Sequence, residues 1–362
     1  MKMLLFGDIS VTAVTTPLFK NKEISTLFTN TLSMFENKDF VFANLECAIT
    51  ESDEKIAKYG PYLKAPYETA EVIKQIGIDC VGLSNNHVFD YGKKGIRDTL
   101  KALEKSGIAY TGFGENYEDS RKNFIVQKNG ERIALIAVCE HEYSYALENR
   151  MGSRPYDEYD TMEDIREAKE NCDRVIVFYH GGKEFCKYPS PRLHKLCHAM
   201  VRNGADVVLC QHSHCIGCYE NYEGGHILYG QGNFHFVKPH SFEGWFTNLA
   251  VNYDTKNNKI EFTPLKNTVS GIKIPDSAEK EKILNEFEQR NKTLLNGEWK
   301  KGWREFCESV KDNYIGIVSN AFTESSSEHQ NGLFSHYLDC EAHTDVWREL
   351  CPSLNLTNCI ED

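Results

Sequence analysis

Side chains that commonly bind metal ions recur at one kind of position in this chain, directly after a short apolar segment. They are Asp8, Glu46, Asn86, His180, His212 and His214. In an open α/β sheet the carboxyl ends of the parallel strands lie along one edge, and ligands bind there. If the apolar segments are strands, the six side chains converge. We therefore predict a metal centre at this edge.

The donor atoms of the six predicted ligands belong to two carboxylates, one amide and three imidazoles. Such a mixture of oxygen and nitrogen suits Mn, Fe, Zn or Co better than a dedicated Ca or Mg site. One tetrahedral ion does not need six ligands, whereas two ions that share a bridging carboxylate use them all. Pairs of divalent ions activate water and stabilise charge on phosphoryl oxygens. The ligand set therefore predicts two divalent metal ions (Mn, Fe or Zn) and a hydrolase.

Each predicted ligand has a simpler explanation when it is considered alone. Asp8 could cap the following turn, Asn86 could occupy a left-handed turn, and His180 could be a packed histidine. For Glu46 we favour a metal ligand over a cap, because a carboxylate that ends an apolar strand is costly to bury without a cation or hydrogen bonds. The sequence His-Ser-His at 212–214 is the most informative element, because its two imidazoles can point the same way.

The elements that would position these residues alternate along the chain. The first 240 residues repeat a short apolar segment, a polar turn and a helical pattern, such as Ile96, Leu100 and Leu103. Strands separated by helices predict βαβ units and a largely parallel core. From about 215 to 265 the pattern changes to antiparallel strands, as in a second sheet packed on the first. From 277 to about 319 the chain is highly charged and is predicted to be helical.

Composition and charge limit the class of protein. The chain has 362 residues, 41% of them hydrophobic, and a net charge of −12, which argues against nucleic acid or an anionic membrane as partner. A small anionic substrate is compatible, because bound metal inverts the local charge. No segment approaches the roughly 20 apolar residues of a membrane span, and segment 3–6 is too short for a signal-peptide core. We therefore expect no membrane span and a cytoplasmic location.

An ordered series of motifs resembles a known family. The motifs are GD at 7–8, NLE at 44–46, SNNHVFDYG at 84–92, HGGKEF at 180–185, GADVVLCQHSH at 204–214 and GQGNFHF at 230–236. Over about residues 1–265 they resemble the CapA-type family of capsule and poly-γ-glutamate biosynthesis, which is related to the calcineurin-like metallophosphoesterases. The resemblance implies a four-layer α/β/β/α sandwich, with a catalytic domain at 1–270. Residues 271–362 would form a helical, cysteine-containing C-terminal extension.

The resemblance also implies how the six ligands divide between two ions. One ion would be held by Asp8, Glu46 and His214. The other ion would be held by Glu46, Asn86, His180 and His212, so that Glu46 is the bridge. The wider superfamily has Asp-x-His in its first motif, whereas Ser10 stands at that histidine position here. One ion would therefore have fewer protein ligands than the other.

Further residues are assigned roles around the metals. By the family pattern, His87 would protonate the leaving oxygen, with Asp90 as its partner. Asn44, His141 and Glu184 are candidate substrate-binding residues. Asn44 belongs to the motif NLE, His141 follows the strand expected at 133–138 and could reach the site, and Glu184 lies four residues after His180.

Three functions fit these residues. We favour a metal-dependent hydrolase of phosphomonoesters or phosphodiesters, acting on a small or a saccharide- or polymer-linked substrate in capsule or polymer metabolism. A second interpretation keeps the metals but moves the reaction to an amide or isopeptide bond of poly-γ-glutamate, since two-metal sites also serve aminopeptidases. The third is a non-hydrolytic accessory protein of a polymer assembly complex, which Ser10 favours. A homo-oligomer is compatible with all three.

Overall fold

The first strand, β1 (Lys2–Ile9), lies inside a seven-stranded sheet, and every residue of it after Lys2 is buried. The structure is a computed structural model in which residues 1–140 and 143–351 are described. The strand order in this sheet is β17 (Ile272–Lys273), β16 (Lys259–Asn267), β15 (Thr247–Asp254), β1, β2 (Phe40–Leu45), β5 (Cys80–Gly82) and β6 (Ala109–Thr111). β1, β2, β5 and β6 are parallel, as the sequence predicts.

A second sheet of six strands carries the remaining predicted βαβ units. Its order is β13 (Tyr219–Tyr222), β14 (Gly225–Leu228), β12 (Val207–Gln211), β11 (Arg174–His180), β9 (Glu131–Cys139) and β8 (Phe124–Lys128). The four central strands are parallel. Two small ladders pair β3 (Ala48–Ile49) with β4 (Lys64–Ala65), and β7 (Phe113–Gly114) with β10 (Gly152–Ser153).

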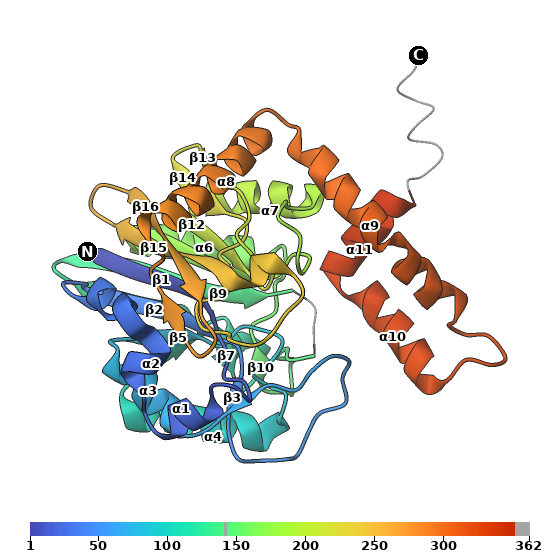
Figure 1. Cartoon of the computed structure of the whole chain (residues 1–362), viewed down its shortest axis with the longest axis horizontal. Helices are drawn as coiled ribbons and strands as arrows, with labels where there is room; N and C mark the ends of the chain where they lie inside the picture. Colours follow the sequence, from blue (N-terminus) through green and yellow to red (C-terminus); the bar gives the residue numbers. More distant parts are fainter. Residues whose placement is uncertain (141–142, 352–362) are drawn as a thin grey trace.

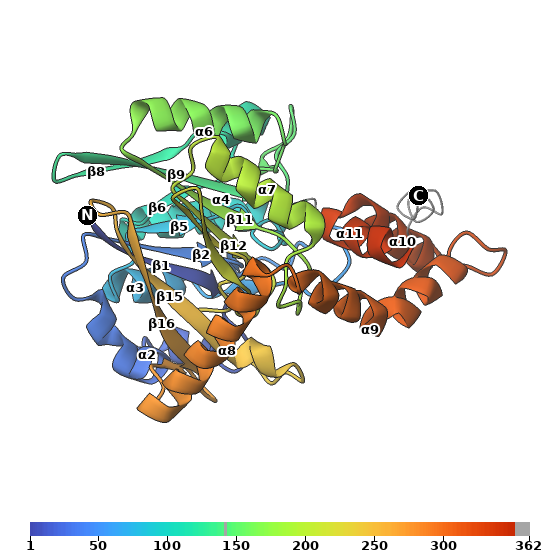
Figure 2. The same ribbon diagram turned by 90° about the horizontal axis from the view of Figure 1, so that it is seen from above.

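The two sheets pack face to face and helices cover their outer faces (Figure 1, Figure 2). Between the sheets Phe42 and Phe178 stack with ring centroids 3.6 Å apart. Over the first sheet lie α1 (Thr16–Lys20), α2 (Ile24–Phe28), η1 (Thr29–Phe35), α3 (Glu68–Gln75) and α4 (Gly92–Ser106). Over the second lie α6 (Asp160–Asn171) and α7 (Pro191–Arg202). The predicted four-layer α/β/β/α sandwich is confirmed. Two short elements, α5 (Tyr117–Ser120) and η2 (Glu243–Phe246), lie in connecting segments.

The antiparallel segment after residue 215 does not form a sheet of its own, contrary to the sequence prediction. Strands β13 and β14 complete one edge of the second sheet, whereas β15, β16 and β17 extend the first. β15 pairs with β1 on one side and with β16 on the other. The reason is that an uncovered sheet edge leaves backbone N–H and C=O groups unpaired. These strands satisfy the backbone of β1 and β12, which alternation in the sequence does not reveal.

The C-terminal helices divide into two groups. α8 (Ser277–Leu295) packs on the sandwich through Ile283 and Phe287, which belong to the core between the sheets. α9 (Trp299–Ser319), α10 (Glu328–Asp339) and α11 (Glu341–Leu350) pack on one another at one end of the molecule (Figure 1). The helices predicted between 277 and 319 are confirmed, and the domain boundary near 270 stays a prediction.

Within residues 1–140 and 143–351, each helix is too short or too polar to cross a lipid bilayer.

Candidate metal centre

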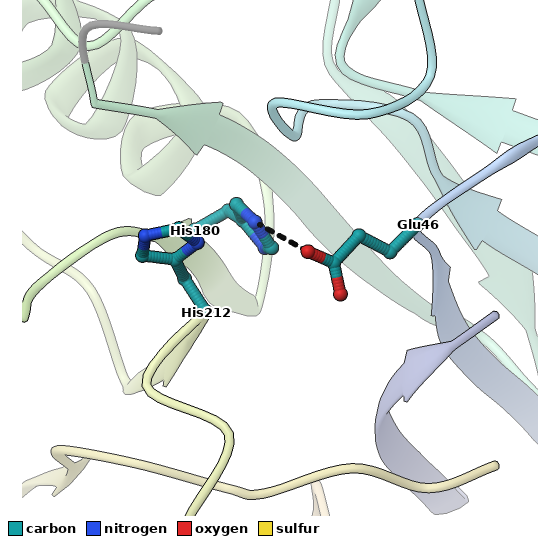
Figure 3. A group of neighbouring side chains, drawn as sticks. All are labelled: Glu46, His180 and His212. Carbon is teal, nitrogen blue, oxygen red and sulfur yellow. Dashed lines mark ion pairs between the residues drawn. The ribbon is translucent and has the colours of Figure 1, made fainter. Parts of the chain in front are cut away.

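The structure brings the six predicted ligands together at the carboxyl ends of five strands. Asp8 lies at the end of β1, Glu46 directly follows β2, and Asn86 lies in the loop after β5. His180 is the last residue of β11, and the sequence His-Ser-His at 212–214 follows β12. The side chains of Glu46, His180 and His212 extend toward one another from the two sheets (Figure 3). Both halves of the sandwich therefore contribute to one site.

The ligand atoms form two overlapping groups that share Glu46. Glu46, His180 and His212 offer atoms that all lie within 4.8 Å of one another, and so do Asp8, Glu46 and His214. His180 Nε2 lies 3.5 Å from Glu46 Oε1, and His214 Nδ1 lies 3.7 Å from Asp8 Oδ2. A pair of divalent ions about 3.5–4 Å apart, with one bridging carboxylate, requires such an arrangement.

Asn86 adds an amide oxygen to the first group. Its Oδ1 lies 3.0 Å from His180 Nε2. Asn85, one residue earlier, holds the loop after β5, because its Nδ2 donates to the Leu45 carbonyl at 2.9 Å and its Oδ1 accepts from the Val88 amide at 2.9 Å. This loop therefore presents Asn86 beside the histidine that ends β11.

The backbone after β12 is left-handed at both histidines, with φ of 76° at His212 and 54° at His214. A non-glycine residue in this region carries a cost of order 1–3 kcal/mol and such residues concentrate at functional sites. The turn is held by the His212 amide, which donates to Asp8 Oδ2 at 3.3 Å. His214 Nδ1 lies 2.8 Å from Asn233 Oδ1. The two imidazoles therefore reach the site through a strained loop that neighbouring polar side chains hold.

The burial of Glu46 tests whether the site fits metal ions. Glu46 is fully buried, and neither of its carboxylate oxygens has a hydrogen-bond partner among the described residues. His212 Nδ1 is likewise buried without a hydrogen-bond partner in this part of the chain. An isolated buried carboxylate costs several kcal/mol unless a cation compensates it. The donor set and the unsatisfied atoms therefore fit divalent ions.

The protonation equilibria of the site agree with metal binding. Burial, together with Glu46, raises the pKa of Asp8 to about 7, and burial raises the pKa of Glu46 to about 7. Burial lowers the pKa of His180 to about 4 and of His212 to about 3, so the imidazoles are neutral near pH 7. Metal ligation needs neutral imidazoles and ionised carboxylates. Bound cations would stabilise the charge that burial disfavours.

A second group of metal-competent side chains differs from the first in its hydrogen bonding. His194 and His198 on α7 lie near Glu220 on β13, with ligand atoms within 4.8 Å. Glu220 Oε1 is 2.8 Å from His198 Nε2 and accepts from the Tyr229 hydroxyl at 2.7 Å. This carboxylate is satisfied by protein groups, whereas that of Glu46 is not. The contrast favours the centre around Glu46 as the metal site.

His87 lies beside the predicted ligands in a hydrogen-bonded group of its own. Its Nδ1 is 2.8 Å from Asp90 Oδ2 and 3.2 Å from Lys58 Nζ. Lys58 is ion-paired with Asp90 Oδ1, and the Leu63 amide donates to Asp90 Oδ2 at 2.7 Å. Burial and Lys58 lower the pKa of His87. Asp90 and Lys58 fix Nδ1, so Nε2 is the ring nitrogen left for the cleft. Lys58 lies outside the motifs, and no sequence signal marks it.

The remaining predicted site residues differ in their placement. Asn44 Nδ2 donates to Asp8 Oδ1 at 2.8 Å, so Asn44 orients a predicted ligand. Glu184 lines a pocket of about 340 Å³ together with His87, His212 and His214. His141, the third candidate for substrate binding, lies outside the described residues. The pocket is also lined by Lys58, Lys183 and Lys238 and by residues of α10 and α11. The sequence analysis missed Lys58, Lys238 and the helical residues because no motif contains them, and it gave no role to Lys183, which lies within the motif HGGKEF.

Comparison with known proteins places the chain in a family. The family model described as "Bacterial capsule synthesis protein PGA_cap" matches residues 2–238. "Capsule biosynthesis protein CapA" of Bacillus anthracis is 32% identical over 255 residues, 68% of this chain and 61% of that protein. "PGA biosynthesis protein CapA" of Bacillus subtilis (strain 168) is 30% identical over 294 residues, 78% of this chain and 76% of the relative.

A more distant relative is the "Probable polyglutamine synthesis accessory protein" of Mycobacterium tuberculosis (strain ATCC 25618 / H37Rv). It is 26% identical over 217 residues, 56% of this chain and 57% of the relative. The chain thus spans only about three fifths of the Bacillus anthracis and Mycobacterium tuberculosis proteins it matches. The family that the motifs predict is confirmed: the chain belongs to the PGA_cap family of bacterial capsule synthesis proteins.

Proposed function

We propose that this protein is a metal-dependent hydrolase of phosphomonoesters or phosphodiesters in capsule or polymer metabolism. The observation that carries the proposal is the buried carboxylate of Glu46, which lies among three histidines and Asp8 without a hydrogen-bond partner in the described residues. Glu46, Asn86, His180 and His212 would hold one ion, and Asp8, Glu46 and His214 the other. When bound, such a pair activates water and polarises the phosphorus–oxygen bond.

The residues around the metals would carry the proton transfer. His87 Nδ1 is held by Asp90 at 2.8 Å, and His87 lines the pocket, so Nε2 is the nitrogen left for proton transfer. A histidine in this position can donate a proton to the oxygen that leaves phosphorus, and such general acids contribute about 10²–10⁴ in rate. Asn44 would keep Asp8 in its ligating orientation. The pocket of about 340 Å³ suits a small substrate or the end of a longer one.

A non-hydrolytic accessory role is the second candidate. Two observations favour it: Ser10 replaces the histidine of the superfamily's first motif, and the Mycobacterium tuberculosis relative is named an accessory protein.

Hydrolysis assays separate the two candidates. Full-length protein loaded with Mn²⁺ or Zn²⁺ is assayed on p-nitrophenyl phosphate, bis(p-nitrophenyl) phosphate and γ-glutamyl p-nitroanilide, beside His212→Ala. We expect turnover of at least one phosphate ester, and a loss of more than about 100-fold in His212→Ala. Cleavage of the anilide alone would move the reaction to amides. The absence of any turnover by the metal-loaded protein would support the accessory role.

A further inference from the structure

The pocket over the predicted metal ligands is closed on one side by the C-terminal helices. α10 and α11 contribute His336, Tyr337 and His343 to its lining, and the sandwich contributes His87 and His214. The family match ends at residue 238, so the wall of the pocket that α10 and α11 form lies outside the matched segment. Residues that select the substrate can therefore come from a part of the chain that the family model does not cover.

Several contacts fix this wall against the sandwich. Asp345 of α11 accepts from Ser190 Oγ at 2.6 Å and from Arg192 Nε at 2.9 Å, both at the start of α7. The Tyr59 hydroxyl donates to the carbonyl of His329, in the first turn of α10, at 2.8 Å. A buried apolar cluster joins the helices to the loop before α7, and its members are Cys186, Trp303, Cys307, Tyr314 and Val346. The wall is thus a packed part of the structure.

The lining of the pocket is cationic although the protein has a net charge of −12. Lys58, Lys183 and Lys238 all line it. Lys58 is ion-paired with Asp90, and Lys183 Nζ lies 3.7 Å from Glu184. Lys238 has no carboxylate within 4.0 Å in the described part of the chain, so its charge is the one available to a ligand.

Two groups in the pocket are held ready for a ligand. Lys238 Nζ lies 4.3 Å from the centre of the Trp245 ring, a cation–π contact that restrains a flexible side chain. His343 is nearly fully buried, and its Nδ1 is 2.6 Å from the Tyr314 hydroxyl. That hydrogen bond leaves Nε2 as the ring atom for the pocket. One group comes from the sandwich and the other from the extension.

We infer that the pocket binds a phosphate ester with a second anionic group, and that Lys238 and His343 are the residues that bind this second group. The inference rests on the proposed function, since the phosphoryl group would lie on the metals. A carboxylate or a second phosphate supplies the required charge, because either forms a short charge-assisted hydrogen bond with an ammonium group. The substrate class is therefore a multiply anionic small molecule or chain end.

A matched pair of substrates tests the inference. Glycerol 2-phosphate and 2-phosphoglycerate have the same phosphorylated secondary alcohol and differ in one group, hydroxymethyl or carboxylate. We expect the metal-loaded full chain to prefer 2-phosphoglycerate in kcat/KM by about tenfold or more. Lys238→Met and His343→Ala should each reduce this ratio toward one, mainly through KM for 2-phosphoglycerate. Lys300→Met is the control, because Lys300 also lies over an indole, that of Trp299, but outside this pocket.

Binding measurements separate failure of this inference from failure of the proposed function. Calorimetric titrations compare pyrophosphate with orthophosphate on metal-loaded wild type and Lys238→Met. If no ester is hydrolysed but Lys238→Met selectively weakens pyrophosphate, the anion site stands and the hydrolase proposal falls. Suppose instead that glycerol 2-phosphate and 2-phosphoglycerate are hydrolysed with equal kcat/KM, and that neither Lys238→Met nor His343→Ala changes the ratio of the two kcat/KM values. The anion site is then overturned and the hydrolase proposal stands.

Discussion

Glu46 is the residue on which both proposed ions depend, because its carboxylate is the member common to the two ligand groups. Without metal it is a buried acid whose pKa burial raises to about 7. An unfolded chain ionises such a carboxyl near pH 4.3. The contribution of Glu46 to the stability of the metal-free protein therefore falls as the pH rises from about 4 to 7, because over that range the unfolded state releases this proton first.

Glu46→Gln should remove this dependence on pH. In EDTA, the stability of the variant is compared with that of wild type at pH 5 and at pH 8. We expect the variant to gain at most about 3 kcal/mol relative to wild type between the two pH values, which raises its melting temperature relative to that of wild type. Thermal unfolding followed by circular dichroism at the two pH values measures the effect. Equal differences at both pH values would show that Glu46 is already ionised at pH 5 and stabilised by other groups.

His87 should affect turnover without affecting metal content. It is held by Asp90 and Lys58, beside the ligands. In His87→Asn we expect bound metal to stay near the wild-type amount. Hydrolysis of alkyl phosphates should fall by about 10²–10⁴, while p-nitrophenyl phosphate, whose leaving oxygen needs no proton, should lose far less. Equal losses for both kinds of ester would remove the acid role, and loss of metal would make His87 a ligand.

At the scale of elements, helix α9 offers a matched pair of glycines. A Cβ built at Gly302 would lie 2.4 Å from Cε2 of Tyr188, whereas a Cβ at Gly316 would meet no atom within 4 Å. Gly316→Ala should stabilise the protein by about 0.5–1 kcal/mol, because alanine loses less backbone entropy in a helix.

Gly302→Ala should instead destabilise it by about 1–3 kcal/mol through overpacking. Urea unfolding of both variants measures the difference. If both alanines stabilise the protein equally, α9 does not pack on Tyr188 as described.

The side chains that gather at the strand ends were predictable from the sequence, whereas those that form the wall of the pocket were not. Asp8, Glu46 and His180 each follow an apolar segment, and parallel strands bring their carboxyl ends to one edge. The left-handed turn at 212–214 is not visible in any propensity, because tertiary hydrogen bonds hold it. Lys238 and His343 line the same pocket although they lie about 100 residues apart in the chain, so neither spacing nor periodicity can reveal them.

At the scale of the whole molecule, the cores that stabilise the sandwich are separate from the metal site. Phe42, Phe178 and Leu209 pack between the sheets, while the predicted ligands lie at or just beyond the carboxyl ends of the strands. Removing metal with EDTA should therefore leave the far-ultraviolet circular dichroism unchanged and lower the melting temperature by a few degrees, since ligands that bind only the native state stabilise it. Loss of secondary structure in EDTA would instead show a protein that folds around its ions.

The central claim is that two ions share Glu46, and a titration of metal-free protein with Mn²⁺ tests it most directly. We predict two ions per chain in two unequal steps, because one ion would have four protein ligands and the other three. Asp8→Asn should remove only the weaker step, and Glu46→Gln should remove both. A single step that Asp8→Asn leaves unchanged, or two steps that survive Glu46→Gln, would contradict the account.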